Sequence, residues 1–391
     1  MDGHTTLDDA IAAVLSHASP LETEDVPLGR ASGRVVAAAA LARVDLPPFA
    51  SSAMDGFAVR SVDTPGTLRV TARIAAGRPA TVALGGGEAM AIATGGVVPE
   101  GADAVVPIEN VREDADRVEV PAVEAGAHVR PRGGDVRAGD EVVRAGARLG
   151  PAQLGAVAAA GADRVTCARR PRAAVLTTGT ELRPAGAELA AGEIYDANGT
   201  LLAAALVGAG CDVDVIEPVA DDEAAHREAL TRALEGDVVV TSGGVSVGPH
   251  DLVRTIAAEL GVEEVFWRVA VKPGKPVSFG VRGRTLLFGL PGNPVSTLVG
   301  FELFVRPAVR ALQGERDPGP RWEDAVLDRA VRRDPRDQLV RARRTATGLE
   351  PLTGQESHMI VRAAEADALA LVPHGDGELA AGSPVRYLRL G

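Results

Sequence analysis

The sequence predicts a multidomain protein of the α/β plus β class, with an α/β domain between segments that are mainly β. The chain has 391 residues, 46% of them hydrophobic, so we expect about two to four domains. Strand and helix patterns alternate regularly over residues 173–312, and short strand-like segments lie on both sides. Strands separated by helices indicate a parallel sheet covered on both faces. The α/β domain is therefore expected to have three layers.

The α/β segment begins with the strand AAVLTTG and the helix NGTLLAAALVGAG, for which Asn198 is the expected N-cap. The strand CDVDVIEPV, the helix DDEAAHREALTRALEG, the strand DVVVTS and the helix DLVRTIAAEL follow in order. The strand patterns VFWRVAVK, PVSFGV and RTLLFGL then precede one long helix, NPVSTLVGFELFVRPAV. Ligands of parallel sheets bind at the carboxyl ends of the strands, and the unusual loops of this segment all lie there. We expect the site at that edge.

The remaining segments have other patterns. Residues 313–321, QGERDPGPR, are rich in charge, glycine and proline and predict a linker. Beyond it, DAVLDRAVRR, DQLVRARR, MIVRAAE, ALALVPHG and PVRYLRL are short alternating segments that predict a small β domain. The basic cluster within DQLVRARR is typical of a solvent-exposed strand face, and consists of Arg341, Arg343 and Arg344.

Composition excludes several classes of function. The net charge of −12 argues against a nucleic-acid partner, although a locally positive pocket can still bind small anions. Cys167 and Cys211 form no metal or disulfide pattern. The N-terminal MDGHTTLDDA lacks the basic and apolar regions of a signal peptide, and no apolar run approaches the roughly 20 residues of a membrane helix. We expect a soluble, cytoplasmic protein without a membrane partner.

The segment 237–251, DVVVTSGGVSVGPHD, leads from a strand through a glycine-rich loop to a helix. Free backbone N–H groups at such a helix N-terminus favour a bound anion, and glycines let the ligand approach closely. The loop residues concerned are Gly243, Gly244, Ser246 and Gly248. Asp251 adds a carboxylate that suits a cation bridging to phosphate. An ordinary βα loop explains the same residues about equally well.

Three more loops of the α/β segment carry polar groups. TTGTEL places Glu181 after a strand, where a simple surface acid is the alternative. VKPGKPV places Lys272 and Lys275 in a loop held by Pro273 and Pro276, which makes them candidates for phosphate binding, although most loop lysines are only solvated. In GLPGNPVST, Asn293 and Pro294 are typical of the cap and the first position of the helix that follows. The alternative interpretation is that the N-terminus of this helix binds an anion. Its candidate binding residues are Pro291, Gly292, Asn293 and Pro294.

Two motifs lie outside the α/β segment. PPFASSAMDGFAV contains Asp55, which a hairpin-type turn also explains. HVRPRGGDV contains Arg130, Arg132 and Asp135, which suit an oxyanion or, alternatively, a salt bridge within the turn. Together the loops supply carboxylates, cations and backbone donors, a mixture that suits a phosphorylated ligand with a divalent metal. No serine or cysteine has the setting of a hydrolytic nucleophile with an assignable histidine.

In combination these motifs resemble a known family. SAMDGFAV, ATGGVVPEGADAVV, RPRGGD, TTGTEL, IYDANG, SGGVSVGPHD, KPGKP and LPGNPVS occur in the order found in molybdopterin molybdenumtransferases, the MoeA and gephyrin E-domain family. The likeness extends from about residue 7 to 390. It implies molybdenum cofactor biosynthesis: molybdate is inserted into adenylylated molybdopterin and AMP is released, with Mg²⁺ as cofactor. Positioning and charge neutralisation should supply most of the rate.

The resemblance also implies an architecture. It consists of an elongated helical domain with an inserted β domain, a three-layer, MogA-like molybdopterin-binding α/β domain and a C-terminal β-barrel. We place these domains at residues 1–44 with 140–170, at 45–139, at 171–315 and at 316–391. The family is homodimeric, and its cleft combines the α/β domain of one subunit with the inserted domain of the other. Further implied partners are the adenylyltransferase that makes the substrate and molybdoenzyme chaperones.

Site residues follow from the matching motif positions. The resemblance implies catalytic roles for Asp55, Thr94, Asp135, Glu181 and Asp251. It implies substrate contacts for Lys272, Lys275, the glycine-rich loop, the LPGNP loop and Ser357 of the C-terminal domain. Arg130 is our choice for molybdate, and the implied metal ligands are Glu181, Asp251 and Asp221. The chain departs from the family pattern at Phe57, Thr180 and the pair Pro249–His250.

Three alternative functions remain open from the sequence. A molybdopterin adenylyltransferase has the same kind of α/β domain, but that domain alone does not account for SAMDGFAV or RPRGGD. A CinA-like pyrophosphatase or deamidase has a related α/β domain and lacks these flanks. A gephyrin-like scaffold would not need the acidic residues, which this chain retains. Molybdate-dependent AMP release distinguishes the transferase from the other three.

Overall fold

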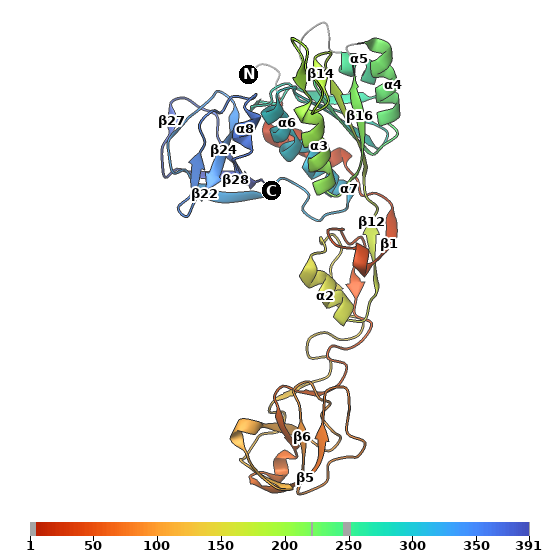
Figure 1. Cartoon of the computed structure of the whole chain (residues 1–391), viewed down its shortest axis with the longest axis vertical. Helices are drawn as coiled ribbons and strands as arrows, with labels where there is room; N and C mark the ends of the chain where they lie inside the picture. The colour runs from red at the N-terminus through yellow and green to blue at the C-terminus, as the bar shows by residue number, and fades with distance from the viewer. Residues whose placement is uncertain (1–4, 220–221, 245–251, 391) are drawn as a thin grey trace.

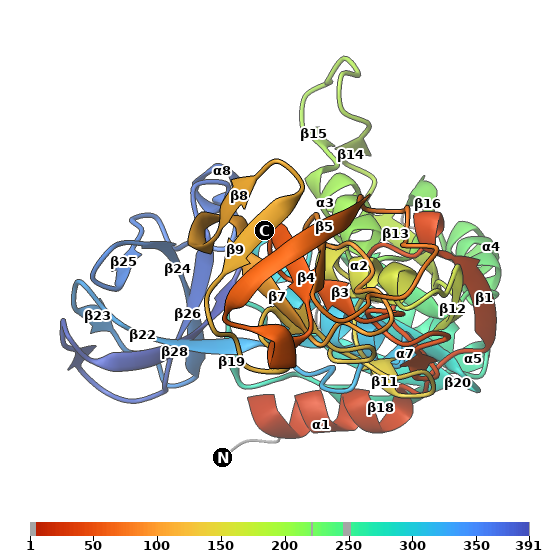
Figure 2. The same cartoon turned by 90° about the horizontal axis from the view of Figure 1, so that it is seen from below.

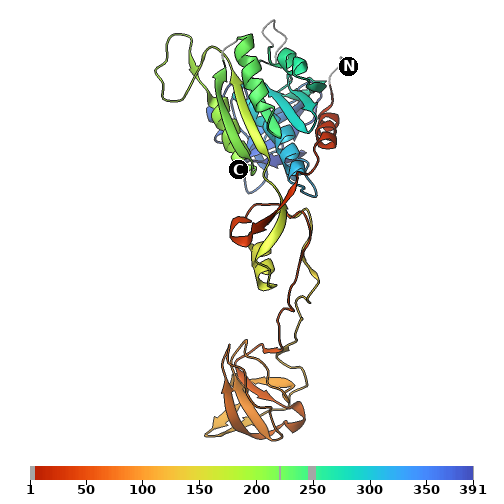
Figure 3. The ribbon, with the colours of Figure 1, turned by 90° about the vertical axis from the view of Figure 1, so that its right-hand side faces the viewer.

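The computed structural model describes residues 5–219, 222–244 and 252–390. The molecule is elongated (Figure 1). The α/β domain and the C-terminal domain lie side by side at one end, the inserted β domain lies at the other, and a slender middle domain connects them (Figures 1 and 3). Within the described ranges, no helix is both long and apolar enough to cross a membrane.

A six-stranded mixed sheet forms the α/β domain. Its strands are, in spatial order, β16 (Asp212–Val219), β13 (Arg172–Thr178), β17 (Val238–Ser242), β21 (Thr285–Leu290), β20 (Ser278–Arg282) and β18 (Glu263–Trp267). The first four are parallel, whereas β20 is antiparallel to both of its neighbours. The prediction of a wholly parallel sheet is therefore wrong at this edge. Arg282 pairs with Thr285, so a two-residue turn joins β20 to β21, and such a hairpin enforces antiparallel pairing.

Helices cover both faces of this sheet, which confirms the three layers. Adjacent residues of β13 point to opposite faces, so Val175 packs with Leu202 on one face and Leu176 packs with Leu230 and Ile256 on the other. The helices are α3 (Ala197–Gly208), α4 (Glu223–Ala233), α5 (Leu252–Glu259), α6 (Pro294–Gly300) and α7 (Arg306–Leu312). The predicted long helix is continuous from α6 to α7 through a π-helical turn, η4 (Phe301–Val305).

The first helix, α1 (Leu7–His17), belongs to the α/β domain, although the sequence placed residues 1–44 with the elongated domain. The hydroxyl of Thr6 caps the helix. Leu7 and Val14 lie in the same buried cluster as Phe304 of η4. The apolar stripe of α1 is buried against η4 and α7, and this packing decides its position.

The middle domain is small. Strand β1 (Thr23–Pro27) pairs with β12 (Arg164–Ala168), and β2 (Ala40–Leu41) pairs with β11 (Glu141–Val143). The helix α2 (Pro151–Ala159) covers this unit, and a short helical turn, η1 (Leu28–Arg30), follows β1. Val26, Val157 and Val165 share its core.

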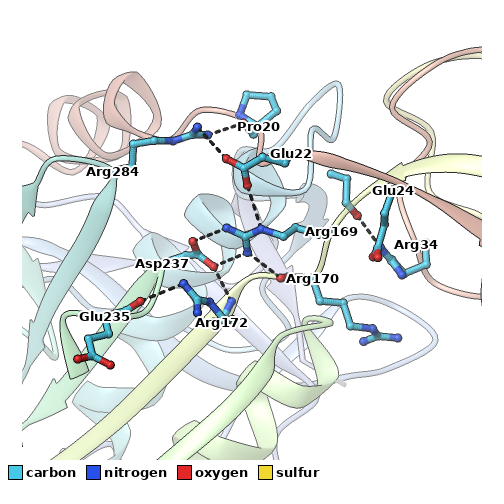
Figure 4. A network of polar contacts seen from close by, with 11 residues as sticks. Pro20, Glu22, Glu24, Arg34, Arg169, Arg170, Arg172, Glu235, Asp237 and Arg284 are labelled. Atoms are coloured by element: carbon cyan, nitrogen blue, oxygen red, sulfur yellow. Dashed lines mark hydrogen bonds and ion pairs between the residues drawn. The ribbon is translucent and has the colours of Figure 1, made fainter. Parts of the chain in front are cut away.

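A polar network joins the middle domain to the α/β domain (Figure 4). Arg169, just after β12, donates to both carboxylate oxygens of Asp237 at 2.7 and 2.8 Å and to Glu22 at 2.9 Å. Asp237 also accepts from the backbone N–H of Arg172 at 2.7 Å. Burial raises the pKa of Asp237, but these donors outweigh it, and the net pKa lies below its ordinary value. Asp237 precedes β17, so the junction lies at the end of the sheet opposite the strand C-termini.

The inserted domain contains a second six-stranded sheet. The order is β7 (Ala104–Pro107), β4 (Gly56–Val59), β6 (Glu88–Ile92), β5 (Gly66–Ile74), β9 (Arg117–Val120) and β8 (Arg112–Asp114). Phe57 and Ala58 lie in separate apolar clusters on its two faces. A short ribbon of β3 (Ser51–Ser52) and β10 (Val129–Arg130) and the helical turns η2 (Ser61–Asp63) and η3 (Ile108–Asn110) complete the domain.

The C-terminal domain is the expected barrel. Its sheet contains β24 (Asp337–Arg344), β25 (Leu349–Pro351), β26 (Ala368–Val372), β28 (Pro384–Arg389), β22 (Trp322–Val326) and the short β19 (Val271–Lys272). Leu327, directly after β22, bridges Leu349 of β25 and closes the sheet on itself. A small ribbon of β23 (Val331–Arg332) and β27 (Glu378–Leu379) lies beside it.

Two expectations for this domain are wrong. MIVRAAE contains the short helix α8 (Ile360–Ala363) and no strand. Arg341 does not belong to a solvent-exposed strand face, because it is only 1% exposed, whereas Arg343 is exposed. Arg341 and Arg343 are two residues apart on β24 and share one face, but the loop that follows β25 covers only Arg341.

Candidate active site

Glycines allow the strand ends of the α/β sheet to meet. A Cβ on Gly243 would lie 2.7 Å from the carbonyl oxygen of Thr178, and the residue has a φ of 93°. A Cβ on Gly292 would lie 3.8 Å from the Cα of Gly243. Residues with side chains could not pass so closely at Gly243, which explains the glycine there. The structure thus brings together the loops after β13, β17 and β21, at the edge where the sequence placed the site.

Asp196 and Asn198, neither of which was predicted as a site residue, connect these loops. Asp196, and not Asn198, is the N-cap of α3: it accepts from the Gly199 N–H at 2.8 Å and from the Thr177 hydroxyl at 2.7 Å. The side-chain amide of Asn198 donates to the Ser242 hydroxyl at 2.9 Å and to the Gly292 carbonyl at 2.7 Å. The segment IYDANG already contained the evidence for the correct N-cap, because Asp196, two residues before Asn198, is an equally good capping residue.

The LPGNP loop contacts the C-terminal domain. Asn293 occupies the N-cap position of α6 and Pro294 the first position. The expected capping hydrogen bond from the Asn293 side chain is absent; its Nδ2 donates to the Ser357 Oγ at 2.9 Å. The Val295 N–H donates to the Ser357 carbonyl at 3.0 Å. Ser357 therefore lies against the N-terminus of α6, beside Pro291 and Gly292.

The KPGKP loop lies between two domains. Lys272 belongs to β19, which pairs with β24 of the barrel, and its Nζ donates to Asp334 at 2.9 Å. Burial raises the pKa of Asp334, but Lys272 and Arg336 outweigh it and hold the net value below its ordinary range. Gly274 packs on α6, since a Cβ there would lie 3.7 Å from the Ser296 carbonyl. Lys275 forms no ion pair with any residue in the described ranges, so its charge is available beside α6.

Glu181 lies at the base of a projecting finger formed by β14 (Leu182–Arg183) and β15 (Ile194–Tyr195), as Figure 2 shows. Its backbone carbonyl accepts from Ile194 at 2.9 Å, and its exposed carboxylate packs over Gly179, 2.7 Å from where a Cβ would lie. This carboxylate accepts no hydrogen bond from the rest of the described chain. Gly179 has a φ of 152° and leaves room for it.

The donor chemistry at Glu181 fits Mg²⁺. No group of three or more histidine, cysteine or acidic side chains that could hold a metal occurs among residues 5–219, 222–244 and 252–390. Mg²⁺ keeps several waters, however, and is commonly held by one or two carboxylates together with substrate phosphates. A single unpaired carboxylate at an anion-binding edge satisfies that requirement. The other predicted ligands, Asp221 and Asp251, lie outside the described residues, as do Ser246 and Gly248 of the glycine-rich loop and the pair Pro249–His250.

The predicted residues of the inserted domain form a second group. The Thr94 N–H donates to the carboxylate of Asp55 at 2.8 Å. The loop after Thr94 is bonded to Ser52 of β3, and Arg130 of β10 pairs with Ser51 of the same strand. Three motifs far apart in the sequence therefore meet at β3. Asp55, Thr94 and Arg130 are all exposed.

The RPRGGD turn separates its charged residues. Arg132 forms an ion pair with Asp45 at 2.6 Å, so the salt bridge considered from the sequence exists but uses Arg132 alone. The backbone N–H of Asp135 donates to the Leu46 carbonyl at 2.9 Å. The side chains of Arg130 and Asp135 form no ion pair within the described part of the chain. They remain exposed and available to a ligand.

One chain does not bring the two groups together. Asp55, Thr94, Arg130 and Asp135 belong to the inserted domain, whereas the strand-end loops, the KPGKP loop and Ser357 lie at the α/β and C-terminal domains. The middle domain stands between them (Figures 1 and 3). Each group by itself holds only part of the predicted polar residues.

Comparison with protein-family models covers nearly the whole chain. Residues 5–161 match the MoeA N-terminal region (domain I and II), residues 174–311 match a probable molybdopterin binding domain, and residues 324–390 match the MoeA C-terminal region (domain IV). The molybdopterin molybdenumtransferase of Haemophilus influenzae is 38% identical over 319 residues, covering 80% of this chain and 78% of the relative. Molybdopterin molybdenumtransferase 2 of Mycobacterium tuberculosis is 37% identical over 383 residues, covering 92% and 93%.

Solved structures agree over the full length. A molybdopterin biosynthesis MoeA protein from Pyrococcus horikoshii superposes with a TM-score of 0.84 at 32% identity, covering 99% of both chains. A second structure of a MoeA protein from this organism gives a TM-score of 0.87 at 26% identity, covering 99% of this chain and 100% of the other. The arrangement of all the domains is therefore shared.

Proposed function

This chain belongs to the MoeA family, and on that premise we propose that it inserts molybdenum from molybdate into adenylylated molybdopterin and releases AMP. The observation that carries the proposal is the convergence of the strand-end loops, the KPGKP loop and Ser357 around the N-terminus of α6. This arrangement supplies backbone donors, a lysine and a hydroxyl at the edge where α/β sheets bind ligands.

The α/β half of the site suits the phosphate groups of the substrate. Gly243 and Gly292 let the strand-end loops pack closely together, and Lys275 carries a charge that no acid in the described ranges neutralises. Lys272 forms an ion pair with Asp334, so it contributes to phosphate binding only if the phosphate replaces Asp334 as its partner. The residues of this half orient the phosphoanhydride, which is the main requirement in phosphoryl chemistry.

The inserted-domain half suits molybdate. Molybdate is an oxyanion, and a guanidinium such as that of Arg130 binds oxyanions through paired hydrogen bonds. Attack by a molybdate oxygen on the pterin-side phosphorus of the anhydride breaks the bond to AMP, which leaves. The dithiolene sulfurs then bind molybdenum, the bond between molybdenum and the phosphate-bound oxygen breaks, and a further oxygen ligand of molybdenum leaves with the thiol protons as water. Mg²⁺, when bound at Glu181, would neutralise charge on the phosphates.

We further propose that the working form is a cytoplasmic homodimer. Because the two halves of the site lie at opposite ends of one chain, a cleft with both halves requires a second copy. A two-fold dimer supplies each α/β half with the inserted domain of its partner and makes two equivalent clefts. This arrangement would explain why Asp55 and Glu181 are separated by the middle domain.

The function is tested by AMP release from adenylylated molybdopterin, with and without molybdate. We expect AMP only when molybdate is present. If the protein instead adenylylates molybdopterin with ATP, it is the adenylyltransferase. If it catalyses neither reaction, the transferase assignment is wrong, and a scaffold becomes the better interpretation.

The role of Glu181 is tested by Glu181→Gln, which keeps the size of the side chain and removes its charge. We expect AMP release to fall by about 100-fold or more, because loss of one transition-state electrostatic contact costs roughly that much. Glu188→Gln, an exposed glutamate in the same finger, is the matched control and should retain full activity. Normal turnover of Glu181→Gln would refute the assignment, and Asp55→Ala tests the other half in the same assay.

A further inference from the structure

Arg341 is a buried arginine without an acidic partner. It lies in the middle of β24, is 1% exposed, and forms no ion pair with any residue in the described part of the chain. Burial lowers the pKa of its guanidinium, and a nearby carboxylate, Glu356, opposes that effect only in part. Buried charges are expensive, so a buried arginine is retained where its donors are used.

Every acceptor of this guanidinium is a backbone carbonyl of one loop. Nη1 donates to the Met359 carbonyl at 2.7 Å, and Nη2 donates to the Gly354 and Glu356 carbonyls at 2.5 and 3.2 Å. The backbone of Arg341 also accepts from Gln355 Nε2 at 2.9 Å and donates to its Oε1 at 3.0 Å. The planar fork thus binds the loop 354–359 at both ends and in the middle.

Ser357 is held inside this loop. Its hydroxyl accepts from Asn293 and its carbonyl accepts from Val295, so the loop presents it to the first turn of α6. The helix α8 that follows the loop also packs beside α6 (Figure 1). The carbonyls on both sides of Ser357 point inward to Arg341, which leaves the serine facing the strand-end loops.

We propose that Arg341 is a positioning residue: its guanidinium fixes the 354–359 loop of the barrel so that Ser357 lies at the strand-end half of the site. The residue itself does not reach the strand-end loops. It acts through the 354–359 loop. The effect of Arg341 on turnover rests on the proposed function, but the effect of Arg341 on the position of the loop does not.

The first test measures loop position without activity. Arg341→Met keeps an unbranched side chain but is shorter than arginine and removes all of the guanidinium donors. Hydrogen exchange of the full-length protein should then be faster by about tenfold at the Val295 amide, because its acceptor on Ser357 is no longer held. Arg343→Met is the matched control on the same strand: Arg343 is 52% exposed, contacts Glu365 at 3.9 Å, and should leave exchange unchanged. Unchanged exchange in Arg341→Met would overturn the proposal.

The second test uses a double-mutant cycle on AMP release. Arg341→Met and Ser357→Ala should each lower kcat/KM, by up to the order of 100-fold for a displaced contact. If Arg341 acts through Ser357, the double variant should lose no more than the worse single variant. Losses that multiply would show a separate, merely structural role and would overturn the proposal.

A third variant keeps the proposal testable if Arg341→Met does not fold. Arg341→Lys retains the charge but replaces a fork by one nitrogen, so we expect a partial loss of activity and an intermediate exchange rate. If Arg341→Lys is fully active and its hydrogen-exchange rate at Val295 equals that of the wild type, the two-pronged guanidinium is not needed and the proposal is contradicted. If the wild-type enzyme and Arg343→Met release no AMP at all, the proposed function fails, while the exchange measurement still decides the role of Arg341.

Discussion

Asp237 carries a charge on which the junction between the middle and α/β domains depends. Its side chain is 11% exposed and that of Arg169 is 30% exposed, so the pair is only partly screened by water. Removing one partner of a well-paired, mostly buried salt bridge leaves the other charge unsatisfied. We therefore expect Asp237→Asn to lower the free energy of unfolding at pH 7 by about 2 kcal/mol, measured by urea denaturation.

The same substitution should change the acid response. Because the folded pKa of Asp237 lies below its unfolded value, its stabilisation is complete above about pH 4 and is lost as the pH falls through the folded pKa. The difference between wild type and Asp237→Asn should accordingly shrink below that pH. As a control, Asp214→Asn breaks an exposed pair with Arg232 and should cost less than about 1 kcal/mol. A difference that stays constant from pH 7 to 3 would contradict this account.

At the scale of elements, α3 is the helix that organises the strand ends. Asp196 caps it and binds Thr177 of β13, and Asn198 in its first turn binds Ser242 and Gly292. Asp196→Ala should lower the free energy of unfolding by about 1 kcal/mol, as loss of an N-cap usually does. It should also reduce AMP release, because the first turn of α3 positions the loops around it.

The control for this prediction is Thr6→Ala, which removes the N-cap of α1 on the same domain. We expect a similar loss of stability in thermal unfolding, with turnover unchanged, because the Thr6 hydroxyl bonds only to Asp9 within the described chain and α1 packs against η4 and α7. Equal losses of activity in both variants would show that the effect of Asp196→Ala is one of general stability.

Most element types could be predicted from the sequence, because apolar periodicity and turn residues are local signals. The three layers and the C-terminal β domain follow that pattern, whereas the barrel was expected only from the family resemblance. The orientation of β20 could not, because it depends on a two-residue hairpin, and α8 was mistaken for a strand because four residues give no clear period. Arg341 was predicted to be exposed for a related reason: alternation shows that Arg341 and Arg343 share a face of β24, but not that a distant loop covers Arg341 alone.

At the scale of the whole molecule, the separation of the two site halves gives the sharpest prediction. Asp55→Ala and Glu181→Ala should each be inactive as homodimers. Co-expressed with different tags, they should form mixed dimers in which one of two clefts has both wild-type residues. Random pairing then restores roughly a quarter of wild-type AMP release.

The control mixes Glu181→Ala with Asn198→Ala, two changes in the same half of the site. In a mixed dimer of these variants every cleft carries one defect, so activity should not return. Recovery in the control, or none in the Asp55→Ala and Glu181→Ala mixture, would refute a cleft shared between subunits. Light scattering on the purified species provides the oligomeric state independently.

Patterns along the chain are sufficient to predict the α/β and β segments and their order, the loops that carry polar residues and the family resemblance. Tertiary structure decided which of those loops meet. It joined Asp55 to Thr94 and Ser357 to Asn293, paired Arg132 with Asp45 and left Arg130 without that partner. It also buried Arg341 beneath the serine loop. These outcomes depend on packing between segments tens of residues apart. Local propensity does not encode such contacts.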